Sequence, residues 1–533
     1  MPTESQSFGN RLERLGRGRF VALVLLMIGL AILRSAISTR LDSFTVDEAY
    51  HIAAGVTYLR FHDFRINPEH PPLVKLWAGA AMNATGFKID PFRRFNDKPD
   101  ERRYAEETVF LHNDPDSVQR RARVAMWILN GLLLLAFALA AERAFGIVVA
   151  LGALLFLVID PTVAAHLPVV MTDLPIALTV SIAILLAIRV FRDWVWSDVL
   201  VCSAFLGLAL ATKHSAPVAL IGVILAGAGA ALLQSEEKHH ATRASRFVKL
   251  GVMMAGALIV LWGFYGFRYT ESHGGEETFN RPLAQKIDDI NSPAYRFVLN
   301  AMSKTHLVPR AYIWGFADTV HAGMEGRVFP QFAFGKFYEG NAPWYFFPGV
   351  IAVKMPIGLS FLSLLGIALF VAGRLPKEWN FACAILLVTT TFFLFVLAHG
   401  ATYAGIRHAL PVVVLLSLSA GVATAISMRA SSRLVRAVVV LAYLAAAISA
   451  VPRLRPWEYF NEFVGGPQNA YKYFVDEGVD LGQRSKELAA YYHQHLQAND
   501  EHPEILYFMP EAELKGRSVD FLGMDMKLSL IHI

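Results

Sequence analysis

Charged side chains beside apolar segments are the first candidates for chemistry in this sequence, because they are costly to dehydrate and usually face a cavity or a partner. The stretch Thr45–Leu76 follows the first long apolar segment. It contains the acidic pair Asp47 and Glu48, then Glu69 and His70 in the polar run NPEHPP. A carboxylate so placed can deprotonate an acceptor hydroxyl or amine. These residues therefore predict acid–base chemistry beside an apolar region.

Further polar residues adjoin later apolar segments. Asp173 lies in the run MTDLP, Arg268 follows another apolar segment, and Tyr403, Arg407 and His408 belong to the run HGATYAGIRHALP. Arginine and histidine can hold a phosphate and stabilise it as a leaving group. Carboxylates and cations from several loops thus predict one cavity that carries both signs of charge.

Composition indicates a polytopic membrane protein. The chain has 533 residues, of which 55% are hydrophobic and 17% charged, whereas soluble proteins carry about 25% charged residues. Many apolar runs approach the ~20 residues that cross a bilayer as a helix. The net charge of +5 is typical of basic cytoplasmic loops and does not indicate nucleic acid as a partner. Cys202 and Cys383 lie in apolar runs, which argues against a disulfide framework and a zinc–thiolate site.

The hydropathy pattern predicts eleven membrane-spanning helices. They fall near 20–37, 122–141, 146–160, 174–190, 198–212, 214–233, 247–267, 346–372, 379–398, 408–427 and 434–451.

Arginines in residues 1–19 place that segment in the cytoplasm, because positive residues concentrate on the inner side. The domain organisation expected is therefore a cytoplasmic N-terminus, a catalytic membrane domain over 20–451 with outer loops at 38–121 and 268–345, and an extracytoplasmic segment over 452–533. The candidate residues then lie outside. No nucleotide sugar occurs there, so an energised donor would be lipid-linked.

The expected fold class is an all-α polytopic membrane protein with additions outside the bilayer. Residues 46–61 and 71–84 read as amphipathic helices at the membrane surface, and residues 452–533 as a small α/β segment. The last residues, LSLIHI at 528–533, match the translation of a common sequencing adapter. We therefore expect the native C-terminus to be missing and the tail to be truncated.

Four motifs give the chain a family resemblance. They are the Asp-Glu pair after the first span, Pro-Pro-Leu at 71–73, Thr-Asp-Leu-Pro at 172–175 and Arg-His-x-Leu-Pro at 407–411. Together they resemble the GT-C membrane glycosyltransferases, and more narrowly the branch with the protein O-mannosyltransferases and the lipid A aminoarabinose transferase. The resemblance covers most of residues 20–485.

The tail carries part of the same resemblance. The run YFNEFVGGP at 459–467 is similar to bacterial members of that branch. The run DEGVDLGQ at 476–483 resembles a family element, Asp-Ser-Asn-x-Asp-Trp-Gly-Gln, but departs from it at Glu477, Gly478 and Leu481. Any substrate-binding part of that element is in doubt here.

The resemblance implies sugar transfer with inversion from a polyprenyl-phosphate donor. It implies that Asp47 activates or orients the acceptor, that Glu48 and Asp173 are supporting acids, and that Glu69 lies beside the donor site. His70 stands where the aminoarabinose transferase has a lysine that faces the lipid phosphate. A cation at this position would be pH-dependent.

The remaining site residues are assigned to the donor. We expect Arg268, Arg407 and His408, together with His70, to bind the donor phosphate, and Tyr403 to line the donor and acceptor site. The resemblance implies an integral protein of the bacterial inner membrane whose acceptor is a protein, lipid A or an envelope glycan.

No cofactor is expected to be required. One branch of the family has a Glu–His zinc site, and Glu69 with His273 or His408 would form it here. A transporter or flippase of a lipid-linked saccharide is the alternative function, and a non-catalytic scaffold is another. A transporter would need ionisable residues near mid-span or broken helices in symmetric positions.

Structural explanations also exist for the site residues. Asp47 and Glu48 could cap a helix, since acids favour helix N-termini, and Asp173 could be an N-cap. Arg268 could extend along the interface, and Arg407, like His408, could anchor to headgroups.

Overall fold

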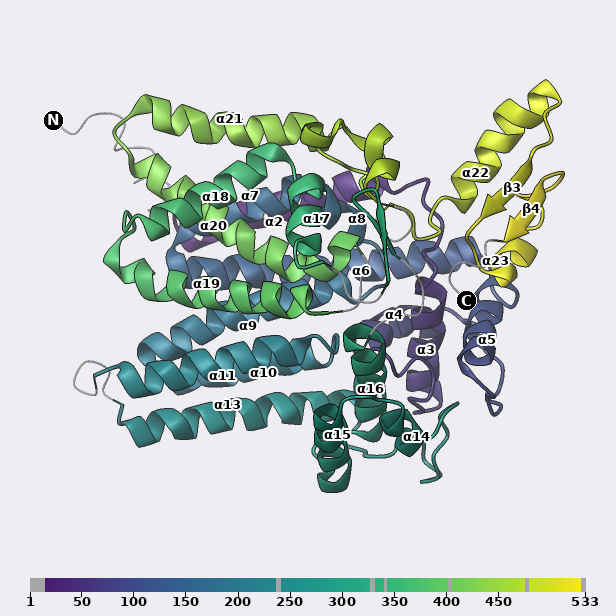
Figure 1. The fold of residues 1–533 in the computed structure, drawn as a ribbon, viewed down its shortest axis with the longest axis horizontal. Coiled ribbons are helices and arrows are strands. Elements are labelled where there is room, and N and C mark those ends of the chain that lie inside the picture. Colours follow the sequence, from purple (N-terminus) through teal and green to yellow (C-terminus); the bar gives the residue numbers. More distant parts are fainter. Residues whose placement is uncertain are drawn as a thin grey trace.

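The fold was analysed in a computed structural model that describes residues 15–235, 241–325, 331–339, 343–400, 405–474 and 479–528. Long helices form a bundle, and the shorter helices and strands gather at one end of it (Figure 1).

All eleven predicted spans are helices in the described part of the chain. Eight are long and apolar enough to cross a membrane, judged by length and composition. These are α2 (Arg17–Ser38), α6 (Pro115–Phe145), α9 (Asp173–Asp193), α11 (Ala216–Leu233), α13 (Arg243–Phe264), α19 (Lys377–Ala398), α20 (Leu410–Arg429) and α21 (Arg433–Ala450). Three are shorter, namely α7 (Ile147–Ile159), α10 (Trp196–Leu210) and α18 (Ile357–Val371).

The span predicted at 346–372 is divided. It consists of α17 (Phe346–Lys354) followed by α18, and Pro356 is the N-cap of α18. Proline has no backbone N–H and its ring disfavours a continuous helix, so the chain starts a new helix there.

Burial differs between central and peripheral helices. The apolar window of α9 is 94% buried, because α6, α10, α11 and α20 pack around it, whereas the window of α2 is 28% buried. Exposed leucines of α2, such as Leu26 and Leu30, form the outer surface of the bundle. Such an outer surface is suited to lipid.

The loop between α2 and α6 contains α3 (Glu48–Arg60), α4 (Leu73–Asn83) and α5 (Lys98–Phe110). The two predicted surface helices are present as α3 and α4, but α3 differs in burial: residues 48–58 are buried on every side. The backbones of α3 and α4 touch at two glycines, since a Cβ on Gly79 would lie 2.4 Å from the carbonyl carbon of Gly55. Helices α4 and α5 cover α3 in the folded protein, and the residue pattern of α3 by itself does not predict this burial.

The remaining elements at this end are short. They are α8 (Pro161–His166), α14 (Leu283–Asp288), α15 (Pro293–Thr305), α16 (Arg310–Met324), β1 (Gln331–Ala333), β2 (Lys336–Tyr338) and η1 (Gly405–Ala409). Strands β1 and β2 pair antiparallel. Helix α16 closes over the start of α4, because a Cβ on Gly315 would meet the Pro68 carbonyl oxygen.

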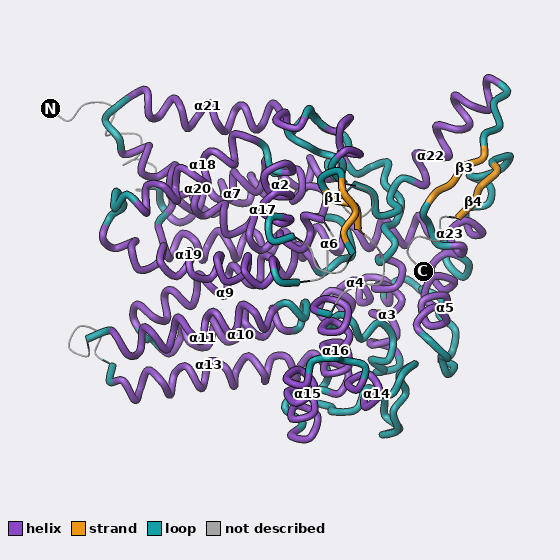
Figure 2. Tube along the Cα trace, viewed as in Figure 1, coloured by secondary structure: helices purple, strands orange, loops and turns teal. Residues whose placement is uncertain are grey.

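The tail contains the expected small α/β segment. Its elements are η2 (Glu462–Val464), η3 (Pro467–Lys472), α22 (Ser485–Tyr491), η5 (Tyr492–Leu496), η6 (Gln497–Asn499), β3 (Glu504–Tyr507), α23 (Glu511–Gly516) and β4 (Asp525–Leu528). Strands β3 and β4 are parallel and lie beside each other (Figure 2). Residues 529–533, to which the adapter hypothesis applies, lie outside the described residues.

Candidate active site

Asp47 lies directly before α3 and meets two arginines from distant parts of the chain. Its Oδ2 is 3.4 Å from Nη1 of Arg407 in η1, and its Oδ1 is 3.9 Å from Nη2 of Arg102 in α5. The Asp47 side chain is 28% exposed and that of Arg407 10%. A reachable carboxylate therefore stands beside a largely buried guanidinium.

The two arginines keep Asp47 ionised. Burial by itself would raise the pKa of Asp47, but the charges of Arg407 and Arg102 more than offset burial and hold that pKa below its ordinary value. An ionised carboxylate is the form that can accept a proton.

Glu48 has a different environment from its neighbour. Its side chain is fully buried, Oε2 accepts the N–H of Thr45 at 2.7 Å, and Oε1 accepts the N–H of Val170 at 3.1 Å. The first bond closes the turn just before α3. Glu48 thus joins the start of α3 to the loop before α9 and positions Asp47.

Asp173 opens α9 and is paired with a lysine. It is 2% exposed, and its Oδ1 is 2.5 Å from Nζ of Lys213, which lies between α10 and α11. Because Val170 bonds to Glu48, the loop that carries Asp173 is held against the start of α3.

Replacing Lys213 by methionine should lower the free energy of unfolding by about 3–5 kcal/mol, because it removes the directly paired cation from the buried charge of Asp173. The double variant Lys213→Met/Asp173→Leu should recover most of that loss. Lys515→Met is a matched control, since Lys515 pairs with Glu511 at the surface, and such pairs contribute about 0–1 kcal/mol. Thermal and denaturant unfolding measure all three. Equal stability of Lys213→Met and wild type would contradict the prediction.

Three histidines surround the carboxylates in neutral form. The rings of His51 and His70 are 5.0 Å apart. Burial lowers the pKa of His51 to about 3 and that of His166 to about 4. Burial and neighbouring cations hold the pKa of His70 well below its usual range. In its neutral form His70 can take part in a hydrogen bond, and its place at the donor phosphate stays a prediction.

Any activity of this site should show no inflection between about pH 5 and about pH 8 that is due to His51, His70 or His166, because these imidazoles are already neutral there. Asp47, whose pKa is lowered, stays ionised over that range, so the loss due to its protonation should appear only at more acidic pH. A pH profile of kcat/KM checks this. Activity that declines as the pH rises through 6.5, the ordinary histidine value, would instead show that a protonated histidine is needed.

Glu69 lies in a second acidic cluster with residues of α5. Its Oε1 is 2.9 Å from Nζ of Lys98. The neighbouring Glu101 accepts hydrogen bonds from Tyr50 and from the N–H of Asn67 at 2.7 Å. Burial and the charge of Glu69 raise the pKa of Glu101. Since Tyr50 and His51 are adjacent on α3, this cluster continues the site that begins at Asp47.

Lys75 holds the turn that carries Glu69 and His70. Its Nζ donates to the hydroxyl of Tyr58 at 2.9 Å, to the carbonyl of His70 at 2.6 Å and to the carbonyl of Asn67. Burial lowers the pKa of Lys75 to about 7.

The structure does not bring Arg268 to Asp47. Arg268 donates to the carbonyls of Thr270, Glu271 and His62, the last of which lies beyond the C-terminal end of α3. Thirteen helical residues separate the two ends of α3, or about 20 Å at 1.5 Å per residue. The assignment of Arg268 to the donor phosphate therefore stays a prediction, and Arg268 does not form part of the group around Asp47.

The remaining predicted residues belong to or adjoin η1. His408 follows Arg407 and is half-buried. A cavity of 10 Å³, room for about one water molecule, is lined by Arg407, His166, Lys354 and Trp457, among others. Tyr403 lies outside the described residues.

The residues named for a zinc site do not fit one. Among the described residues, no group of three or more His, Cys, Asp or Glu side chains could hold a metal ion. Glu69 pairs with Lys98, and the ring of His273 lies 5.8 Å from that of His62. These residues therefore do not provide a metal site for the chemistry.

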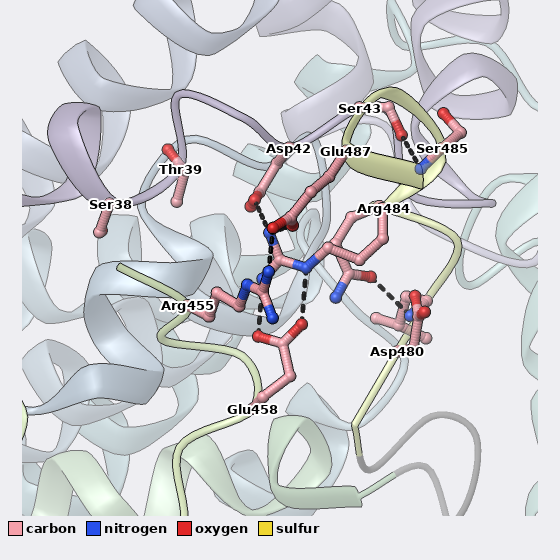
Figure 3. A network of polar contacts seen from close by, with 12 residues as sticks. Ser38, Thr39, Asp42, Ser43, Arg455, Glu458, Asp480, Arg484, Ser485 and Glu487 are labelled. Carbon is pink, nitrogen blue, oxygen red and sulfur yellow. Dashed lines mark hydrogen bonds and ion pairs between the residues drawn. The ribbon is translucent and has the colours of Figure 1, made fainter. Parts of the chain in front are cut away.

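The tail holds the chain just before Asp47. The N–H of Ser43 donates to the carbonyl of Gln483 at 2.7 Å, and the N–H of Val46 donates to the carbonyl of Leu481 at 2.9 Å. Arg484 anchors this contact through ion pairs with Asp42 and Glu458 (Figure 3). Arg484 is thus a positioning residue for Asp47.

Sequence reasoning missed several of these partners. Arg102 lies in a stretch that was predicted to be a loop. Its only sequence signal is the spacing of four from Glu106, with which it forms an ion pair on α5. Arg484 follows directly after the family-like tail element. Lys98 and Glu101 gave no sequence signal, because their partners lie elsewhere in the chain.

Fold and site together define an integral membrane protein whose paired carboxylates and cations meet at one end of a helical bundle. No known family model and no curated protein matches the chain. Solved structures similar to it include ArnT from Cupriavidus metallidurans bound to undecaprenyl phosphate, at 13% identity and a TM-score of 0.47, over 95% of this chain and 86% of that one.

Two further similar structures are longer than this chain. The apo oligosaccharyltransferase of Archaeoglobus fulgidus has 14% identity and a TM-score of 0.49, over 94% of this chain and 64% of that one. The S. cerevisiae protein O-mannosyltransferase Pmt1-Pmt2 complex bound to the sugar donor has 16% identity and a TM-score of 0.34, over 49% and 34%. At these identities and TM-scores, function has to be argued from the chain's own residues.

Proposed function

We propose that this protein is an inverting glycosyltransferase that moves a sugar from a polyprenyl-phosphate donor to an acceptor at the outer face of a membrane. The observation that carries the proposal is the pair formed by Asp47 and Arg407. It places a reachable, ionised carboxylate next to a guanidinium at the end of a membrane bundle.

The chemistry follows from that pair. Asp47 accepts the proton of an acceptor hydroxyl or amine as the acceptor attacks the anomeric carbon. The bond from that carbon to the phosphate oxygen breaks, its electron pair leaves with the polyprenyl phosphate, and a single displacement inverts the configuration. Arg407, with Arg102 beside it, stabilises the charge that develops on the phosphate.

Other residues support these two roles. Asp173 and Lys213 carry a second buried ion pair on the loop that Glu48 fixes to α3. His70, in its neutral form, is a hydrogen-bonding group and Glu69 a carboxylate in the adjoining cluster. We place His70 and Glu69 on the donor side of the site and keep Asp173 as a supporting acid, as the sequence resemblance implies.

The sidedness of the site is proposed from charge. Arg192 lies in the last turn of α9, and Arg429 and Arg433 flank the turn between α20 and α21, whereas the candidate site lies at the other ends of α9 and α20. If basic ends face the cytoplasm, the site is extracytoplasmic, in a bacterial inner membrane. Protein, lipid A and envelope glycan remain as acceptor classes.

A transporter of the same lipid-linked saccharide is less well supported. Transport through the bilayer generally needs polar groups near mid-membrane. The central turns of α9, α19 and α20 contain no ionisable residue.

The test is sugar transfer from a panel of radiolabelled polyprenyl-phosphate sugars, with membranes that contain the protein or lack it. Label in a protein, lipid or glycan fraction only when the protein is present would establish the reaction and its acceptor class. The proposal fails if folded protein transfers label from no donor. Movement of intact donor across the bilayer without transfer would establish the transporter instead.

A further inference from the structure

A second hollow lies away from the carboxylates, between α4 and the first half of α6, which pack side by side (Figure 1). It has a volume of 490 Å³ and is lined mainly by apolar side chains, among them Trp77 and Ala80 of α4 and Val124 and Ile128 of α6. The Trp77 indole N–H donates to the carbonyl of Ala125 at 2.7 Å and so fixes the two walls.

The groove is separate from the candidate active site. Lys75 points from α4 toward α3, where it bonds to Tyr58. Trp77, two residues later, points from the other face of α4 toward α6. Helix α4 thus stands between the groove and the turn that carries Glu69.

Two arginines stand at the groove on α6. Arg120 and Arg121 are exposed and line it. Among the residues that the structure describes, neither guanidinium makes a hydrogen bond or an ion pair. Arg123 contrasts with them, because it is buried and donates to the carbonyls of Thr39 and Ser43. The charges of Arg120 and Arg121 are therefore available to an anion from outside the protein.

The position of these arginines along α6 defines the anion further. The sequence of α6 becomes continuously apolar soon after Arg123, so Arg120 and Arg121 lie at the membrane boundary. One exposed apolar stripe continues from them into the span: Val124, Ile128 and Leu132 are 51%, 51% and 53% exposed. These residues are four apart and share one helix face. The two arginines are placed to bind the phosphate of an anionic lipid headgroup, and the apolar stripe is placed to contact its acyl chain.

We propose that the groove between α4 and α6 binds an anionic phospholipid of the surrounding bilayer. Arg120 and Arg121 hold its phosphate, and one acyl chain lies against Trp77 and the stripe from Val124 to Leu132. This site is distinct from the proposed donor site, and its occupant is not a substrate.

The experiment measures lipid binding by the purified full-length chain and needs no sugar transfer, so it is independent of the proposed function. Phosphatidylglycerol and phosphatidylcholine are each titrated, with native mass spectrometry as the readout. We expect preferential binding of phosphatidylglycerol. The variant Arg120→Gln/Arg121→Gln should weaken it about 30-fold, because two surface cations are lost. Phosphatidylcholine binding should not change.

Two further variants make the test specific. Ala80→Trp fills the groove from an exposed position of α4 and should reduce phosphatidylglycerol binding with both arginines intact. Arg94→Gln removes an exposed arginine that does not line the groove and should leave binding unchanged. Equal affinity for both lipids, or an equal loss with Arg94→Gln, would overturn the proposal. So would displacement of phosphatidylglycerol by polyprenyl phosphate together with an equal loss of polyprenyl phosphate binding in the double variant, because the groove would then belong to the donor.

Discussion

Replacing Asp47 by asparagine should lower the rate of sugar transfer by about 100- to 10,000-fold, the usual contribution of a positioned base. Asparagine keeps the shape of the side chain but cannot accept the acceptor's proton. Arg407 and Arg102 remain in place to hold the donor phosphate, so donor affinity should change little. Initial transfer rates, donor binding and thermal unfolding of the same preparation measure the three quantities separately.

Asp90→Asn is the matched control for charge removal in the same loop. Asp90 is 61% exposed and forms an ion pair with His112 at the surface, so its replacement should leave the transfer rate unchanged. If Asp47→Asn transferred sugar as fast as wild type, Asp47 would not be the base. If Asp47→Asn lost stability as well as activity, the effect would be structural.

Arg484→Gln should lower the free energy of unfolding by about 3–5 kcal/mol, because it leaves buried carboxylates without their cation. Asp42 is 2% exposed, and Glu458 accepts from both Nε and Nη2 of Arg484 at 2.6 Å. The variant should also lose turnover, since the segment that it loosens bonds to Val46, next to Asp47. Denaturant unfolding and kcat, measured on one preparation, check both effects.

The loss at Arg484 should depend on pH in a defined direction. Burial raises the pKa of Asp42 to about 6 even with Arg484 beside it, and removing the arginine should raise it further. A carboxyl whose folded pKa is raised costs stability when ionised, and the cost disappears as the pH falls toward the unfolded pKa. The stability difference between wild type and Arg484→Gln should therefore be smaller at about pH 5 than at about pH 8.

A matched control lies in the same network. Arg455 pairs with Glu487 beside Arg484 (Figure 3) but is 61% exposed, so Arg455→Gln should change stability by about 0–1 kcal/mol. The double variant Asp42→Asn/Arg484→Gln should be more stable than Arg484→Gln alone. Equal effects of Arg455→Gln and Arg484→Gln would mean that the buried network is not the anchor of the tail.

The helices of the bundle could be predicted because their signal is local. Runs of apolar residues as long as α9 or α20 have few alternatives to a membrane helix, since every backbone polar group must be satisfied within the segment. The helix predicted over residues 46–61 is present as α3 (Glu48–Arg60). Its burial could not be predicted, because α4 and α5 cover the face that a surface helix would expose.

The site could be predicted only in part, because its contacts join residues that are distant in the chain. Asp47 and Arg407 could be predicted as site residues because they are charges beside apolar segments. Their contact at 3.4 Å could not be predicted, because they lie 360 residues apart in the chain. Arg268 had the same kind of signal, yet the structure places it near the far end of α3. Residue type and flanking hydropathy thus identify candidates and do not say which of them meet.

The sequence alone determined that this is a polytopic helical membrane protein with carboxylates and cations beside its spans, because hydropathy, helix length and capping depend on neighbours in the chain. Tertiary structure decided which charges pair, that burial lowers the pKa of His70, and that Arg484 holds the segment before Asp47. These properties depend on desolvation and on charges brought together by folding. Many of the partners lie far apart in the chain, as Asp47 and Arg407 do.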